Sequence, residues 1–463
     1  MVFSSITFLF YFLPIVLIIY YLVPNKYKNA VLLISSFAFY FYGEPKNIYI
    51  MIFSIIFTYI FGILIDKYRG KKYDKIFLIL SISISIGLLI YFKYADFIIK
   101  NINLWLSNKL DLIHVILPIG ISFYTFQMIS YIADVYRGEA KVQKNIFKLA
   151  TYVSLFPQLI AGPIVRYTTI ENQLENREYN IKNFAIGVRR FIIGLGKKVM
   201  IANVIGNLIS IFSASGEKSV LFYWLYAISV MLQIYFDFSG YSDMAIGLGK
   251  MFGFEFLENF NYPYIATSIT DFWRRWHISL STWFRDYVYI PLGGNRVNKW
   301  KWLRNIIIVW LLTGLWHGAE WNFVIWGLYF GVLLIIEKII LLKWLKKTPK
   351  IINRIYTLFI VMISFIIFNG DGISTILENI GGLFGIANIP LITNESIYYL
   401  KSYAIVIIVG IIGATPICKN ITNKERLKKI VNTIEPIYLL LILVICTSYI
   451  VDGSFNPFLY FRF

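Results

Sequence analysis

Long runs of apolar residues without a charged side chain most constrain what this chain can fold into. Residues 2–23, 48–65, 76–92 and 306–316 are such runs, and several approach the ~20 apolar residues that cross about 30 Å of hydrocarbon. Of the 463 residues, 58% are hydrophobic and only 15% are charged, too apolar a composition for a water-soluble core of ordinary proportions. The bilayer is therefore the expected solvent.

The net charge of +19 does not indicate nucleic acid as a partner. The basic residues form short clusters between apolar runs, which is the positive-inside pattern of membrane proteins. We expect an all-α, polytopic integral protein of the plasma membrane, one domain over residues 1–463, with about 10–12 spans plus re-entrant or interfacial helices and an outside N-terminus. The expected cytoplasmic clusters lie at Lys26 and Lys28 and within 66–75, 137–148, 296–304, 343–354 and 419–429.

Three polar or broken segments do not have the pattern of simple spans. Residues 117–134 and 158–166 contain proline and glycine among polar side chains, and residues 236–243 contain two aspartates, two serines and a glycine. Irregular backbone survives in lipid only where protein or a water-filled cavity covers it. We therefore expect re-entrant or cavity-lining pieces at these places.

Two of the three histidines stand in aromatic, weakly charged surroundings. Before His277, Ser268 and Asp271 have the spacing of a capping box, which predicts a helix start. Aromatic residues recur at helical spacing beyond it, so we expect one amphipathic helix through His277, lying at the membrane surface or entering a cavity. This predicted helix includes Trp273, Trp276, Leu280 and Phe284, and its Arg274, Arg275 and Arg285 are available to anions.

His317 lies instead at the end of an apolar run. If Arg304 marks the cytoplasmic edge, the ~13 helical residues between them carry His317 about 20 Å into the bilayer. A titratable ring there is costly to bury without a partner, so a functional role is the default hypothesis. Imidazole is the usual general base toward a hydroxyl or thiol, and His277 could orient a substrate or stabilise charge.

Each of these residues also has a structural interpretation. A buried Trp–His pair serves in hydrogen-bonded packing as often as in catalysis. Asp237 and Asp243 could line a polar path or pair with nearby Arg or Lys side chains. The sequence has no serine-hydrolase, P-loop or zinc-protease motif, and three histidines with Cys418 and Cys446 do not supply a conventional metal site, so we expect no metal.

Six segments spread over the chain carry a family resemblance. They are LPIGISFYTFQ at 117–127, ADVYRG at 133–138, FPQLIAGPI at 156–164, YFDFSGYSD at 235–243, the whole of 272–294, and NPFLYFRF at 456–463. In these segments the sequence resembles the membrane-bound O-acyltransferase superfamily, and within it the bacterial alginate O-acetylase type of membrane protein.

The resemblance implies a helical fold with a thinned centre, where a cytoplasmic cavity for the acyl donor meets an outer funnel for the acceptor. His317 matches the family's near-invariant histidine, proposed as general base, and His277 matches a position that is His or Asn in such proteins. Gln158 stands where some relatives have histidine, so no role is assigned to it. The residues expected to contact substrates are Trp316, Trp276, Arg275, Asp237, Ser239 and Asp243.

The implied activity is transfer of an acyl group, usually acetyl, from a cytoplasmic thioester to hydroxyls of an extracytoplasmic polysaccharide, directly or through an exported SGNH-type partner. Acetyl-coenzyme A is the expected donor, and no cofactor is expected to stay bound. Two alternatives remain open. One is D-alanyl transfer to teichoic acid from an acyl-carrier protein, and the other is a non-enzymatic polysaccharide transporter.

Overall fold

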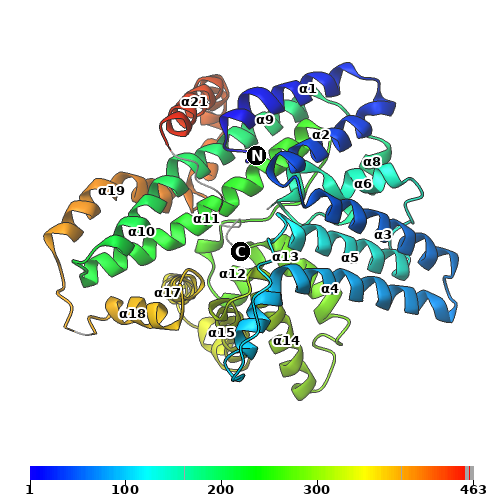
Figure 1. The fold of residues 1–463 in the computed structure, drawn as a ribbon. Coiled ribbons are helices and arrows are strands. Elements are labelled where there is room, and N and C mark those ends of the chain that lie inside the picture. Colours follow the sequence, from blue (N-terminus) through cyan, green and yellow to red (C-terminus); the bar gives the residue numbers. More distant parts are fainter. Residues whose placement is uncertain (161, 387, 454–457, 459–463) are drawn as a thin grey trace. The chain divides into compact units, whose positions relative to one another are not determined.

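The regular structure of the protein is helical. The computed structural model describes residues 1–160, 162–386, 388–453 and 458, and every regular element in these residues is a helix (Figure 1). The all-α prediction is therefore confirmed.

The chain forms two compact units. Unit 1 consists of Met1–Phe191 and Ser242–Leu257, and unit 2 of Ile192–Tyr241 and Glu258–Phe463. The boundaries fall inside α9 (Ile181–Gly196), inside α11 (Val220–Met251) and in the loop after α11. The single domain expected over residues 1–463 stays a prediction.

Eight helices in the described residues are long and apolar enough to cross a bilayer. The first two, α3 (Ile48–Lys67) and α4 (Lys72–Ile102), contain the apolar runs 48–65 and 76–92. The shorter apolar segment 31–42 lies in α2 (Lys28–Gly43), whose 16 residues extend only about 24 Å, less than the hydrocarbon thickness. The other six are Ile181–Ala214, Val220–Met251, Trp321–Leu345, Lys350–Phe368, Asn394–Gly413 and Lys429–Asp452.

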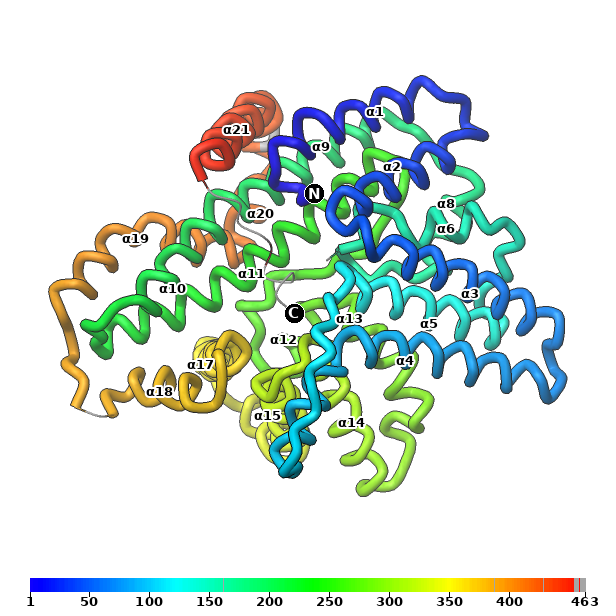
Figure 2. Tube along the Cα trace, viewed as in Figure 1, coloured from blue at the N-terminus to red at the C-terminus, as the bar shows by residue number. Residues whose placement is uncertain are grey.

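In unit 1, α5 (Ile121–Arg137) is a buried central helix. It packs against α3 and α4, which run beside it in Figures 1 and 2. All residues from 121 to 135 are buried, so the polar side chains of this segment lie inside protein. The remaining elements of unit 1 are η1 (Thr7–Phe12), α1 (Leu13–Leu22), η2 (Asn25–Tyr27), α6 (Ile146–Ser154), α7 (Phe156–Leu159) and α8 (Tyr167–Glu175).

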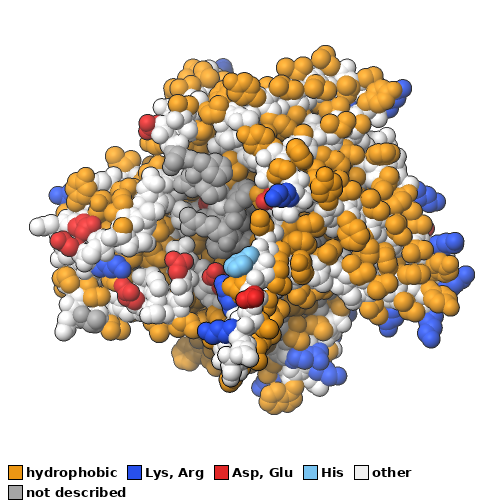
Figure 3. Space-filling model, in the orientation of Figure 1, with side chains coloured by type: hydrophobic (Ala, Val, Ile, Leu, Met, Phe, Trp, Pro, Cys, Tyr) orange, Lys and Arg blue, Asp and Glu red, His pale blue; other side chains and the backbone are white. Residues whose placement is uncertain are grey.

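The outward surface of α3 and α4 is apolar. In Figure 3 hydrophobic side chains cover most of the right-hand part of the view, where α3 and α4 lie, and basic side chains gather at its outer edge. Phe53, Ile60, Ile79 and Ile90 are among the large apolar side chains that these two helices expose. Such a surface is the one expected of helices that contact lipid.

The segment 236–243 does not break the chain as expected. It lies within the continuous helix α11, so the expectation of an irregular piece there is wrong. The small residues permit close packing instead, because a Cβ on Gly240 would come within 2.8 Å of the Gly194 carbonyl oxygen of α9. Membrane helices approach one another closely at such residues without losing their own hydrogen bonds.

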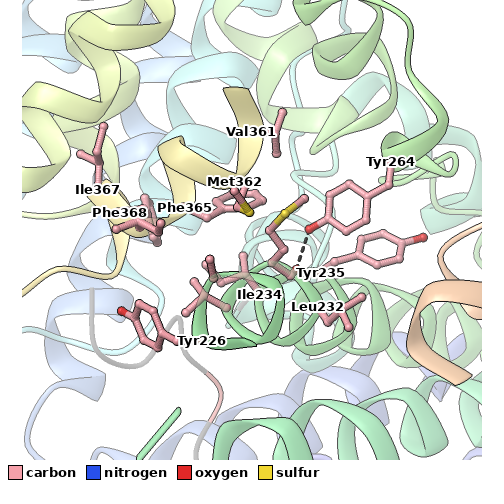
Figure 4. Close-up of a cluster of buried hydrophobic side chains, with 14 of the residues drawn as sticks. Tyr226, Leu232, Ile234, Tyr235, Tyr264, Val361, Met362, Phe365, Ile367 and Phe368 are labelled. Atoms are coloured by element: carbon pink, nitrogen blue, oxygen red, sulfur yellow. Dashed lines mark hydrogen bonds between the residues drawn. The ribbon is translucent and has the colours of Figure 1, made fainter. Parts of the chain in front are cut away.

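Unit 2 has an aromatic-rich core. Side chains of α11 and α17 (Lys350–Phe368) meet there, and the Tyr264 hydroxyl donates to the Met231 carbonyl oxygen at 2.5 Å (Figure 4). This bond satisfies a phenol that is otherwise enclosed by apolar groups. The other elements of unit 2 are η3 (Lys197–Asn203), α10 (Val204–Ala214), η4 (Pro263–Ile265), α12 (Ile269–Arg275), α13 (Ile278–Phe284), η5 (Arg285–Tyr289), α14 (Lys299–His317), α15 (Trp321–Ile336), η6 (Glu337–Leu341), α16 (Leu342–Leu345), α18 (Ile373–Leu383), α19 (Asn394–Gly413), α20 (Ile417–Thr422) and α21 (Glu425–Asp452).

Helices α14 and α15 cross at two glycines. A Cβ on Gly314 would come within 2.3 Å of the Phe323 carbonyl oxygen, and one on Gly327 within 2.3 Å of the Trp310 carbonyl oxygen. The two backbones therefore touch, and neither position has room for a side chain. Because His317 is the last residue of α14, this crossing fixes the histidine relative to α15.

Replacing Gly314 by valine is expected to force α14 and α15 apart. Overpacking of this kind costs roughly 1–3 kcal/mol or more, so the thermal transition of the purified protein in detergent should fall by several degrees. Gly87→Val in α4 is the matched control, since nothing lies within 4 Å of a Cβ at Gly87. Equal transitions for the two variants would contradict the close crossing.

Candidate active site

His317 is enclosed by aromatic rings of three helices. It ends α14 and is 4% exposed. Its ring centre lies 4.9 Å from that of Trp316, 5.0 Å from Trp326 of α15 and 5.2 Å from Phe368 of α17, each nearly perpendicular to it. Aromatic walls of this kind keep bulk water away from the imidazole. The continuous helix from Arg304 to His317 confirms the helix assumed in the sequence argument.

The end of α17 is held beside this ring by one buried amide. The Asn322 side chain, in the first turn of α15, donates at 3.1 Å to the carbonyl oxygens of Phe368 and Gly370. These carbonyls belong to the last turn of α17 and the residues after it, which have no helical partners of their own. Asn322 therefore keeps Phe368 in contact with His317.

His277 lies in a break between two short helices. The expected single helix is wrong here, because α12 ends at Arg275, α13 begins at Ile278, and His277 between them has φ 42° and ψ 55°. Bonds to an earlier loop replace the helical ones: Asn261 N–H donates to Arg275 O at 2.9 Å, and Ile278 N–H to Asn259 O at 3.0 Å. The start predicted at Ser268 is confirmed, since its hydroxyl accepts from Asp271 N–H.

The His277 ring is fully buried and contacts both polar and aromatic groups. Its Nδ1 lies 3.1 Å from Asn259 Oδ1 and 3.5 Å from Ser279 Oγ. Phe238 of α11 packs against it in an edge contact with ring centres 4.6 Å apart. Burial lowers the pKa of the His277 imidazole from 6.5 to about 3, so the ring is neutral at physiological pH.

Trp316 joins the two histidines into one site. Its ring centre lies 5.8 Å from that of His277 and 4.9 Å from that of His317. Residues from separate parts of the sequence thus meet around one indole, while their catalytic roles stay a prediction. Two imidazoles in a largely apolar enclosure could accept and return a proton or orient a polar substrate.

Comparison with known proteins identifies the family. The model of MBOAT, the membrane-bound O-acyltransferase family, matches residues 139–370, a range that contains His277, His317 and Trp316. Two curated relatives cover most of the chain. A protein named "Probable alginate O-acetylase AlgI" from Azotobacter vinelandii is 43% identical over 379 residues, 81% of this chain and 76% of its own. A peptidoglycan O-acetyltransferase from Helicobacter pylori is 36% identical over 427 residues, 84% of this chain and 81% of its own.

This chain is a membrane-bound O-acyltransferase. Together with its candidate spans, the family makes it a multi-pass membrane protein. A teichoic acid D-alanyltransferase from Bacillus subtilis is a partial match, 32% identical over 261 residues, 53% of this chain and 65% of its own.

Two buried polar groups that the sequence did not indicate hold the segments that carry the candidate site. Asn259 contacts His277, although 18 positions separate them, because the loop before α12 folds back. Glu337, in a π-helical turn, is fully buried and accepts from Ile269 N–H at 2.6 Å and from the backbone and hydroxyl of Thr270 at 2.9 and 2.5 Å. A carboxylate thus caps the start of α12, where the helix dipole favours a negative charge.

The other residues expected to contact substrates lie in varied surroundings. Trp276 packs among aromatic rings, with Phe260 at 5.0 Å and Phe365 at 5.1 Å. Arg275 pairs with Asp271 at 2.9 Å. Ser239 is buried on α11, and its hydroxyl has no hydrogen-bond partner within the described part of the chain.

The two aspartates of the YFDFSGYSD segment are both paired. Asp237 forms a buried ion pair with Lys198 in unit 2, each 2% exposed. Asp243 belongs to unit 1, where it accepts from both Nε and a terminal nitrogen of Arg190 at 3.0 and 2.9 Å. Their expected contact with substrate stays a prediction. In residues 1–160, 162–386, 388–453 and 458, no three His, Cys, Asp or Glu side chains are grouped to hold a metal ion.

Replacing Glu337 by glutamine should weaken the start of α12. One backbone N–H would then face an NH₂ group instead of an oxygen, which costs about 1–3 kcal/mol. We expect a lower thermal transition and reduced acyl transfer with both histidines intact. Glu378→Gln, in an exposed pair with Lys218, is the control. A Glu337 variant that melts and transfers like the control would refute the capping role.

The pair of Asp237 and Lys198 can be tested by separate and joint replacement. Asp237→Asn should destabilise the protein by roughly 3–5 kcal/mol, because it removes the carboxylate charge that faces a buried ammonium. Asp237→Leu combined with Lys198→Met should restore much of the stability. If the double variant regains acyl transfer together with its stability, Asp237 has a structural role. A folded but inactive double variant would instead support contact with substrate.

Proposed function

We propose that this acyltransferase moves an acetyl group from acetyl-coenzyme A at the cytoplasmic face to a hydroxyl of an extracytoplasmic polysaccharide. The proposal is supported by two curated relatives, each covered over at least three quarters of its length, whose names specify O-acetyl transfer to alginate or peptidoglycan. The acceptor class is a hydroxyl-bearing cell-surface polymer. An exported SGNH-type partner could receive the acetyl group on a side-chain hydroxyl before the polymer does.

The single observation that carries the mechanism is the meeting of His277 and His317 around Trp316. In the proposed step, His317 takes the proton of the attacking hydroxyl as its oxygen bonds to the thioester carbonyl carbon. The carbon–sulfur bond then breaks, and the coenzyme A thiolate leaves with that proton, which returns His317 to its neutral form. His277 orients a substrate or stabilises the developing charge.

D-alanyl transfer from a carrier protein is the second candidate. It is supported by the teichoic acid D-alanyltransferase relative, but that likeness extends over only 53% of this chain. The two candidates share the chemistry at the histidines and differ in the donor. Transport without acyl transfer is disfavoured, because the chain belongs to an acyltransferase family.

Replacing His317 by glutamine should abolish transfer. Loss of a general base lowers the rate on the order of 10²- to 10⁴-fold. Proteoliposomes with the protein, its exported partner and the polymer would receive [¹⁴C]acetyl-coenzyme A inside, and label on the polymer would be counted. His114→Gln, in an exposed loop, is the matched control and should transfer normally.

Two results would overturn parts of this proposal. Wild-type transfer by the His317 variant would remove its assignment as base. Transfer of label from a D-alanyl carrier protein, with none from acetyl-coenzyme A, would establish the second candidate instead.

A further inference from the structure

One buried asparagine holds the backbone and ring around His277. Asn259 has no exposed surface. Its Oδ1 lies 3.1 Å from His277 Nδ1, 3.2 Å from Ser279 N and 2.9 Å from Ser279 Oγ, and its carbonyl oxygen accepts from Ile278 N–H. The side chain and the backbone of Asn259 together therefore contact the three residues that begin with His277.

The backbone of Ser279 fixes which way the Asn259 amide faces. The two ends of an asparagine amide are distinguished by their partners, and a backbone N–H can only donate. The atom facing Ser279 N–H must therefore be the amide oxygen. The Ser279 hydroxyl donates to the same oxygen at 2.9 Å, so its single proton is not directed to the more distant His277 Nδ1 at 3.5 Å.

An oxygen opposite Nδ1 selects one tautomer of the His277 ring. If Nδ1 had no proton, its lone pair would face the lone pairs of Asn259 Oδ1 at 3.1 Å, which is repulsive. Nδ1 therefore carries the hydrogen and donates to Oδ1. In a neutral ring the lone pair is then on Nε2. That Nε2 is buried and has no hydrogen-bond partner among the described residues.

We propose that Asn259 is a positioning residue that holds His277 in the Nδ1–H tautomer, so that Nε2 accepts a hydrogen bond from a bound substrate. This inference rests on the proposed acyl transfer and decides between two roles left open for His277. A lone pair on Nε2 repels a developing oxyanion, so in this tautomer the ring orients a substrate and does not stabilise the negative charge. The group that it accepts from is an N–H or O–H, such as a pantetheine amide of the donor or a hydroxyl of the acceptor.

The test measures the ¹⁵N chemical shifts of the His277 ring and the kinetics of acetyl transfer in the same variants. Full-length protein with ¹⁵N-labelled histidine is reconstituted in lipid, and His277 is assigned by its loss in His277→Gln. We expect a pyrrole-type shift for Nδ1 and a pyridine-type shift for Nε2. Asn259→Leu, of similar size, should mix or reverse these shifts and lower kcat/KM on the order of 10²-fold, because a misplaced group costs about that much. Asn259→Asp keeps an oxygen acceptor opposite Nδ1 and should restore both the ¹⁵N shifts and kcat/KM.

Asn305→Leu is the matched control for loss of a buried asparagine. Asn305 is also fully buried, and its amide donates to the carbonyl oxygens of Leu292 and Gly294. It should leave the His277 shifts unchanged even if it lowers stability. A rise in KM for acetyl-coenzyme A alone in Asn259→Leu assigns the bonded group to the donor, and a rise in KM for the polymer alone assigns it to the acceptor.

The outcomes separate this inference from the proposed function. A wild-type ring with hydrogen on Nε2, or an Asn259→Leu variant with unchanged shifts and kinetics, would overturn the role of Asn259 while acetyl transfer stands. Wild-type protein that keeps the expected tautomer but transfers no acetyl group would overturn the proposed function instead.

Discussion

The close crossing of α14 and α15 is the contact on which the histidine site depends. Inside a bilayer the hydrophobic effect adds little to helix association, so packing at small residues decides which helices meet. Gly314 and Gly327 bring the two backbones into contact one turn from His317. As a result Trp326 of α15 stands against the ring, and Asn322 of the same helix holds the end of α17 beside it. One short stretch of glycine contact thus assembles three helices around the imidazole.

Buried charges in unit 2 hold the scaffold in place around the site. A charge in a low-dielectric interior is tolerated only where hydrogen bonds or a counter-charge compensate it. Glu337 meets this condition by accepting three hydrogen bonds at the start of α12, and Asp237 meets it through Lys198. The His277 ring itself is surrounded by aromatic rings and polar groups of Asn259 and Ser279, and its burial keeps it neutral.

Composition and periodicity predicted the helical class, the long apolar helices α3 and α4 and the helix start at Ser268. These sequence patterns failed where tertiary contacts determine whether a segment is helical. The segment at 236–243 has the residues of a break, but close packing at Gly240 keeps it helical. The opposite occurred at His277, where aromatic spacing suggested a continuous helix and the loop at Asn259 interrupts it. Asn259 and Glu337 lie far along the chain from the residues they hold, so no local pattern could reveal them.

The backbone at His277 restricts the residue as strongly as the chemistry does. A positive φ costs most side chains of the order of 1–3 kcal/mol, but histidine and asparagine are among the residues that occur there more often. Both can also present a hydrogen-bond acceptor at the end of a short side chain. Residue 277 is therefore restricted twice, by a turn with positive φ that few side chains tolerate and by the contact between its ring and Asn259 Oδ1.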